Sequence, residues 1–70
     1  MEFVTVTYPE SRTVFIDDED SGRTNETLRV DEGTHTFDLG APMDYKPESI
    51  TVTIRNTTAV SPQEVRFEVA

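Results

Sequence analysis

Cysteine and tryptophan are both absent from this chain of 70 residues, which also contains only three glycines and a single lysine, Lys46. Without cysteine the chain forms no disulfide and offers no thiolate to a transition metal. A domain of this size buries only about 60% of the surface that its unfolded chain exposes, so its stability depends on packing, a bound ion or a neighbouring chain. We expect one domain over residues 1–70, because the chain is too short for a second core.

Basic side chains are scarce, with 6 Lys+Arg against 14 Asp+Glu and a formal net charge of −8. Nucleic acids and anionic membrane surfaces are also negative, so neither is expected as a partner. Apolar runs extend over only a few residues, and the N-terminus lacks the basic region of a signal peptide, so we expect no membrane insertion. The expected location is cytoplasmic if residues 1–70 are the whole natural protein, and the cell envelope if they are excised from a longer chain.

Helical periodicity is missing as well, and apolar residues instead alternate with polar ones along six segments. These segments are 3–8, 12–17, 27–30, 34–39, 49–55 and 63–69. Alternation gives each strand one dry face and one wet face, which two sheets packed face to face satisfy. The sequence therefore predicts an all-β fold, a small antiparallel β-sandwich of about six strands, immunoglobulin-like in general architecture. The side chains expected to face inward are Val4, Val6, Tyr8, Val14, Ile16, Leu28, Val30, His35, Phe37, Leu39, Ile50, Val52, Ile54, Val65, Phe67 and Val69.

Turn-forming residues separate the predicted strands. The segment "RVDEGTHTF" (29–37) predicts a tight hairpin, in which Gly33 supplies the positive φ that such turns need. Two longer connections, 40–48 and 56–62, complete the chain.

The opening segment "YPESRTVFIDD" (8–18) is similar to that of the PEGA domain family, named for a Pro-Glu-Gly-Ala motif before a strand that ends in Asp-Gly. Pro9 and Glu10 match the motif, while Ser11 and Arg12 replace its Gly-Ala. Asp18 stands where the family usually has glycine.

Later landmarks resemble the same family in the same order. "GRT" (22–24) matches its Gly-x-Thr, "EGTHTFDL" (32–39) its glycine-led hairpin with a histidine strand, and "DYKPESITVTI" (44–54) its tyrosine-bearing loop and next strand. The resemblance implies an all-β module that is often appended to larger envelope or signalling proteins of bacteria and archaea. The family has no established catalytic residues, so none is implied here.

The four consecutive acids at 17–20 raise the question of a calcium site. An EF-hand loop that starts at Asp17 would need a bidentate acid at its twelfth position, where this chain has Leu28, so that motif fails. A looser site formed by Asp17, Asp18 and Asp20 in an acidic loop over 17–22 is a candidate, because calcium accepts flexible cages of oxygen ligands. We favour the other interpretation, a solvated turn whose charges protect a sheet edge.

Catalysis would require more than the sequence offers. His35 is the only histidine, and no nucleophile or second imidazole is placed to work with it. Paired acids such as Asp31-Glu32 lie in predicted turns and not across a substrate cleft. We therefore expect no enzyme activity and no cofactor, and a packed His35 with one ring nitrogen hydrogen-bonded.

The loop 41–48 is a candidate contact surface, with Met43, Tyr45 and Lys46 as candidate residues, although Tyr45 is expected to fold back over one end of the sandwich. The expected function is a non-catalytic interaction or spacer module that binds another protein through a sheet edge or this loop. The alternative is a ligand-binding module for calcium or a cell-envelope carbohydrate. A monomer and a weak edge-paired dimer both fit the sequence.

Overall fold

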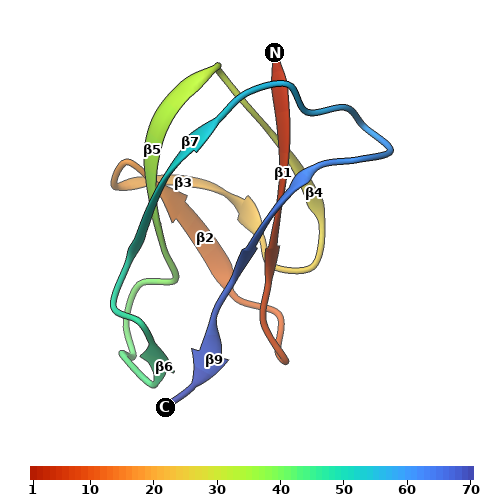
Figure 1. The fold of residues 1–70 in the computed structure, drawn as a ribbon. Helices are drawn as coiled ribbons and strands as arrows, with labels where there is room; N and C mark the ends of the chain where they lie inside the picture. The colour runs from red at the N-terminus through yellow and green to blue at the C-terminus, as the bar shows by residue number, and fades with distance from the viewer.

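The computed structural model describes all of residues 1–70 and contains nine short strands (Figure 1). The strands are β1 (Glu2–Thr7), β2 (Thr13–Ile16), β3 (Glu19–Arg23), β4 (Thr27–Val30), β5 (Gly33–Asp38), β6 (Tyr45–Lys46), β7 (Ile50–Ile54), β8 (Gln63–Arg66) and β9 (Glu68–Val69). No helix is long and apolar enough to cross a membrane.

Two main sheets form the sandwich. One sheet has the strand order β4-β1-β8, and the other has the order β3-β2-β5-β7. A third, two-stranded sheet of β6 and β9 lies at the end of the molecule where the C-terminus is found (Figure 1). The predicted all-β sandwich is confirmed.

Most of the core consists of alternating residues from both main sheets, as the period-two pattern predicts, and Tyr45 of β6 joins them. Its thirteen buried side chains are Val4, Val6, Tyr8, Val14, Ile16, Leu28, Val30, Phe37, Leu39, Tyr45, Ile54, Val65 and Phe67. Ile50 and Val52 pack against this cluster but stay partly exposed. The prediction is wrong for Val69, which is 56% exposed. The ladder of β8 ends at Arg66, so Val69 lies in β9, beyond the end of the core.

The pairing of the strands differs from a purely antiparallel sandwich at one place. β8 runs parallel to β1, with Val4 opposite Gln63 and Thr7 opposite Arg66. The connection 55–62 carries the chain from β7 in one sheet to β8 in the other, and β8 then runs in the same direction as β1. Alternation assigns faces to a strand but not its neighbours, so the sequence pattern could not have revealed this pairing.

The predicted hairpin around Gly33 is wrong. β4 pairs with β1, whereas β5 pairs with β2 and β7, so residues 31–32 connect two different sheets. Gly33 does adopt a positive φ of 141°, but this conformation serves the crossing between sheets and not a two-residue turn.

The true tight hairpin is at the acidic corner. β2 and β3 are joined by Asp17 and Asp18 alone, whose φ angles of 53° and 68° are both positive. Two successive residues with positive φ are characteristic of a type I′ turn, which favours Asp or Asn first and glycine second. The expected loop over 17–22 is therefore shorter than predicted, because Glu19 and Asp20 already belong to β3.

We predict that Asp18→Gly stabilises the protein by about 0.5 kcal/mol, because glycine adopts a left-handed φ without the steric cost of a Cβ atom. Asp18→Ala is the matched control, since it removes the same charge but keeps the Cβ atom. Urea unfolding of the three proteins measures the effect. Equal stabilisation by alanine and glycine would show that charge, and not backbone conformation, is responsible.

Candidate functional site

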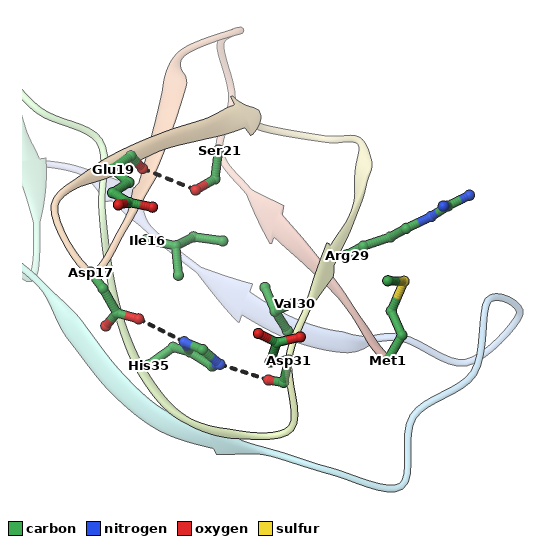
Figure 2. A pocket seen from close by; sticks show the side chains of 9 residues that line it. All are labelled: Met1, Ile16, Asp17, Glu19, Ser21, Arg29, Val30, Asp31 and His35. Carbon is green, nitrogen blue, oxygen red and sulfur yellow. Dashed lines mark hydrogen bonds and ion pairs between the residues drawn. The ribbon is translucent and has the colours of Figure 1, made fainter.

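Of two open pockets of about 300 Å³ each, the one that contains His35 lies between β3, β4 and the start of β5 (Figure 2). His35 is its central polar group, and the side chain is only 16% exposed. Nδ1 of His35 lies 2.7 Å from Oδ2 of Asp17, and Nε2 lies 2.7 Å from the carbonyl oxygen of Asp31. The histidine thus connects the turn between β2 and β3 to the segment between β4 and β5.

This geometry favours the protonated form of His35. A backbone carbonyl and an ionised carboxylate only accept hydrogen bonds, so both contacts are satisfied when each ring nitrogen carries a proton. The hydrogen bond with Asp17 is the main cause that raises the pKa of His35, and the bond to the Asp31 carbonyl adds to it. The pKa of Asp17 is lowered, mainly by the hydrogen bond from the backbone N–H of Thr36 and to a smaller extent by the hydrogen bond with His35. The expectation of one bonded ring nitrogen is corrected to two.

The pocket brings together some of the residues that the sequence singled out. Asp17 is engaged through both carboxylate oxygens, because Oδ1 accepts from the N–H of Thr36 at 3.0 Å. Asp18 follows in the turn and Asp20 lies within β3, opposite Phe15. No three His, Asp or Glu side chains are grouped so that they could hold a metal ion. When both of its ring nitrogens donate, His35 has no lone pair with which to accept a proton from a substrate.

At the other end of the sandwich, the segment 39–44 is held by Arg12. Nη1 of Arg12 lies 2.6 Å from Oδ1 of Asp44, and Nη2 donates to the carbonyl of Pro42 at 2.9 Å. The carbonyls of Leu39 and Gly40 accept more weakly, at 3.4 and 3.3 Å. The Arg12 side chain is only 14% exposed, whereas its partner Asp44 is 54% exposed, so the ion pair lies at the surface. The hydrogen bond with Asp44 raises the pKa of Arg12 further above its ordinary value.

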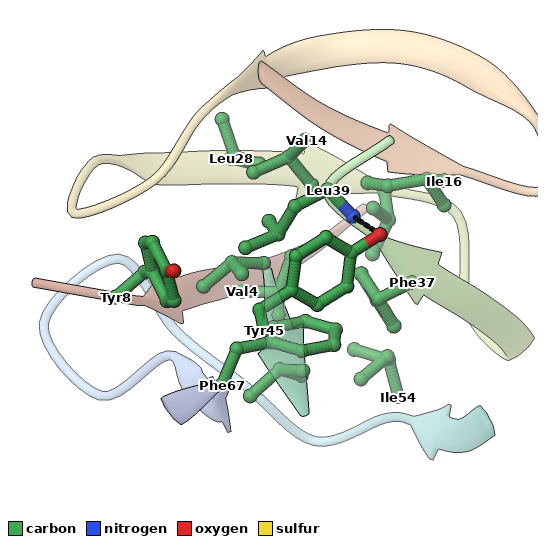
Figure 3. Close-up of a cluster of buried hydrophobic side chains, with 13 residues drawn as sticks. Val4, Tyr8, Val14, Ile16, Leu28, Phe37, Leu39, Tyr45, Ile54 and Phe67 are labelled. Carbon is green, nitrogen blue, oxygen red and sulfur yellow. Dashed lines mark hydrogen bonds between the residues drawn. The ribbon is translucent and has the colours of Figure 1, made fainter. Parts of the chain in front are cut away.

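The guanidinium group of Arg12 also contacts two aromatic rings. Its Cζ atom lies 5.9 Å from the ring centre of Tyr8 and 5.5 Å from that of Tyr45. Tyr45 packs edge-on against Phe67, and its hydroxyl accepts from the N–H of Leu39 at 3.2 Å (Figure 3). Cation–π contacts of this kind fix the rings as well as the charge.

The three candidate contact residues of the loop have different positions. Tyr45 is 3% exposed and belongs to the core, so it is not available to a partner. Met43 is 57% exposed, although its sulfur accepts a hydrogen bond from the Tyr45 hydroxyl at 3.3 Å. Lys46 is exposed in the short strand β6, opposite Glu68. The loop is therefore tied down, and the surface that it presents is small.

Thr24 and Asn25 hold the turn that positions Arg12. The hydroxyl of Thr24 accepts from the N–H of Arg12 at 2.9 Å and donates to the carbonyl of Glu10 at 2.7 Å. The side-chain amide of Asn25 binds the N–H and the carbonyl of Tyr8, at 3.2 and 2.7 Å. The Gly-x-Thr spacing marked this segment in the sequence, but nothing there connected it with Arg12.

The outer side of β7 is a third candidate site. The backbone of Thr36 faces β2, because its carbonyl accepts from the N–H of Asp17 at 2.8 Å. Backbone groups alternate in direction along a strand, so His35, and not Thr36, is hydrogen-bonded to β7. Thr51 lies opposite Thr36, and Thr53 lies opposite Thr34. The N–H and C=O groups of Thr51 and Thr53 therefore point away from β5.

Side-chain contacts support this assignment. The hydroxyls of Thr36 and Thr51 are 3.0 Å apart, and those of Thr34 and Thr53 are 2.9 Å apart. Side chains approach most closely at pairs whose backbones do not bond to each other. Since β5 is the only strand that pairs with β7, the outward groups of Thr51 and Thr53 form a free edge.

The free edge of β7 differs from the other edges in charge. β3 carries Glu19, Asp20 and Arg23, β4 carries Arg29, and β8 carries Glu64 and Arg66. β7 reads Ile-Thr-Val-Thr-Ile and has no charged residue. Charged side chains are a common protection against unwanted pairing, and β7 lacks this protection.

Comparison with known proteins identifies a family and no individual relative. The model of the PEGA domain matches residues 3–66, which is nearly the whole chain. No curated protein and no solved structure matches.

We predict that Arg12→Lys destabilises the protein by about 2 kcal/mol, because lysine cannot bind the Asp44 carboxylate and the loop carbonyls together. Arg29→Lys is the control, since Arg29 is exposed on β4 and forms no ion pair. Urea unfolding measures stability, and amide hydrogen exchange at 39–44 reports on the loop. If both variants lose the same stability, Arg12 does not hold the loop.

We predict that stability falls at alkaline pH through His35. Its folded pKa is raised above the ordinary 6.5, so its contribution is complete below that value and is lost as pH rises through the folded pKa. Asp17 acts at the opposite limit: its pKa is lowered from 3.8, so its contribution is present above 3.8 and is lost as pH falls through the folded pKa.

His35→Gln is expected to abolish the alkaline part of this dependence, because glutamine does not titrate. Urea unfolding across mildly acidic to alkaline pH gives the profile, and proton NMR follows the ring of the single histidine directly. An unchanged alkaline slope in the variant would contradict the assignment.

Proposed function

Because the chain belongs to the PEGA domain family, whose members are small modules of a non-catalytic type, we propose that it is a protein-interaction module that binds an extended segment along the free edge of β7. In this mode the segment adds a strand to the sheet β3-β2-β5-β7. Main-chain hydrogen bonds supply affinity, and alternate side chains supply specificity.

The observation that carries the proposal is the outward direction of the Thr51 and Thr53 backbones on an uncharged strand. A partner strand there would meet threonine hydroxyls on the solvent face. On the other face it would meet the partly exposed Ile50 and Val52. A segment with the same alternation of apolar and small polar residues fits both faces.

The loop 41–48 is the weaker of the two expected contact surfaces. Its largest side chain, Tyr45, is buried, and its Pro42 carbonyl and Asp44 carboxylate already accept from Arg12. Met43 and Lys46 alone offer little area to a partner.

We predict that Thr53→Pro abolishes the binding of extended peptides while leaving the fold intact. Proline removes only an N–H that points to solvent, and edge strands tolerate it for that reason. The probes are short peptides selected against the domain from a displayed random library, and titration calorimetry measures their binding. Amide hydrogen exchange shows whether Thr51 becomes protected.

Two controls make the result specific. Thr53→Ala keeps the outward N–H and is expected to bind as the parent does, whereas Val52→Pro removes an N–H that is bonded to β5 and is expected to unfold the sheet. If peptides bind the Thr53→Pro variant as tightly as the parent but bind the Met43→Ala variant more weakly, the loop 41–48, and not β7, is the contact surface.

A further inference from the structure

The sequence of β7 is a palindrome. Ile-Thr-Val-Thr-Ile reads the same from either end, with Val52 at its centre. If two copies of β7 pair antiparallel about a twofold axis at Val52, Ile50 lies opposite Ile54 of the second copy and Thr51 lies opposite Thr53. Residues directly opposite each other share a face of the sheet, so like side chains meet like on both faces.

The direction of the backbone groups agrees with this register. Thr51 and Thr53 direct their N–H and C=O groups away from β5, and in the symmetric pair each of them faces the other across the axis. Such opposite residues exchange both hydrogen bonds. Every outward backbone group of the two threonines is then satisfied, which a register shifted by one residue would not achieve.

The rows of side chains on each face of the sheet also continue across the axis. In one copy Thr34 contacts Thr53 at 2.9 Å, and Thr36 contacts Thr51 at 3.0 Å. Pairing places Thr53 beside Thr51 of the second copy, so the row of hydroxyls extends from Thr34 of one chain to Thr36 of the other. On the opposite face, the half-exposed Ile50 and Val52 gain apolar neighbours.

Charge limits self-association to this edge. Each chain carries a net charge of −8, so two copies repel one another at long range. Among the edges of the two main sheets, only β7 brings no charged side chain into the contact. Like charges elsewhere on the two surfaces are screened by salt, so the contact is expected to strengthen as ionic strength rises.

We propose that the free edge of β7 binds β7 of a second copy. The two chains then join their four-stranded sheets into one continuous sheet about a twofold axis at Val52. The inference rests on the proposed function, since it names the strand that occupies the same edge.

Cysteine cross-linking tests the register. The chain has no cysteine of its own, so one introduced thiol reports on one position. Across the axis the two Val52 residues form a non-hydrogen-bonded pair, whose short Cα separation suits a disulfide. Val52→Cys is therefore expected to form a disulfide-linked dimer on mild oxidation. Ile50→Cys lies opposite residue 54 of the second copy and is expected to stay monomeric.

Two further measurements complete the test. Sedimentation equilibrium of the parent chain is expected to show an average mass that rises with protein and salt concentration, and Thr53→Pro is expected to remove this rise. Adding Thr53→Pro to Val52→Cys is expected to prevent the cross-link. Equal cross-linking of Val52→Cys and Ile50→Cys, or a monomeric mass at every concentration and salt, would overturn the dimer.

The outcome separates this inference from the proposed function. If the parent chain stays monomeric but selected peptides bind in a manner that Thr53→Pro abolishes, the edge is an interaction site and only the self-pairing is wrong. If neither peptides nor a second copy pair with β7, both the inference and the proposed function are wrong.

Discussion

The guanidinium group of Arg12 closes one end of a sandwich that has neither a disulfide nor a large core. It binds Asp44 and three loop carbonyls on one side and contacts the rings of Tyr8 and Tyr45 on the other. Tyr45 belongs to the same arrangement, because its hydroxyl accepts from the N–H of Leu39 and its ring packs on Phe67. The short chain thus compensates for its small apolar core with one cation that makes several hydrogen bonds and ring contacts at once.

The part of the fold that the sequence predicts is the part that alternation determines. Val4, Val6 and Phe37 are fully buried because each stands on the apolar side of a period-two pattern. The identity of neighbouring strands is not local information, since it depends on where the connections cross between sheets. For this reason the parallel β1–β8 pair and the crossing before Gly33 could not be read from the pattern. The prediction that Val69 is buried was wrong for a related reason, because alternation does not show where a core ends.

Single residues of the candidate site could be recognised in the sequence, but the contacts between them could not be predicted. Asp17 and His35 each attracted attention in the sequence, but their contact arises from a two-residue turn at Asp17 and Asp18 that brings the carboxylate back over β5. In the sequence Arg12 stands out only as a departure from the PEGA motif, because a charged residue after a turn is ordinarily solvated. Its importance depends on a loop about thirty residues later in the chain, and only the folded structure joins the two.

The alternation of directions along each strand, which forms the core, also determines what β7 presents to other molecules. The pairing of Asp17 with Thr36 directs one set of β5 backbone groups to β2, which leaves the other set for β7. The outward set on β7 then belongs to the threonines, and the strand centre, Val52, bonds inward. An edge of this kind can pair with another strand, and charged side chains are one common protection against such pairing. Charged residues occur on every other edge of the two main sheets and are missing from β7, which supports the proposal that its free edge pairs with another strand.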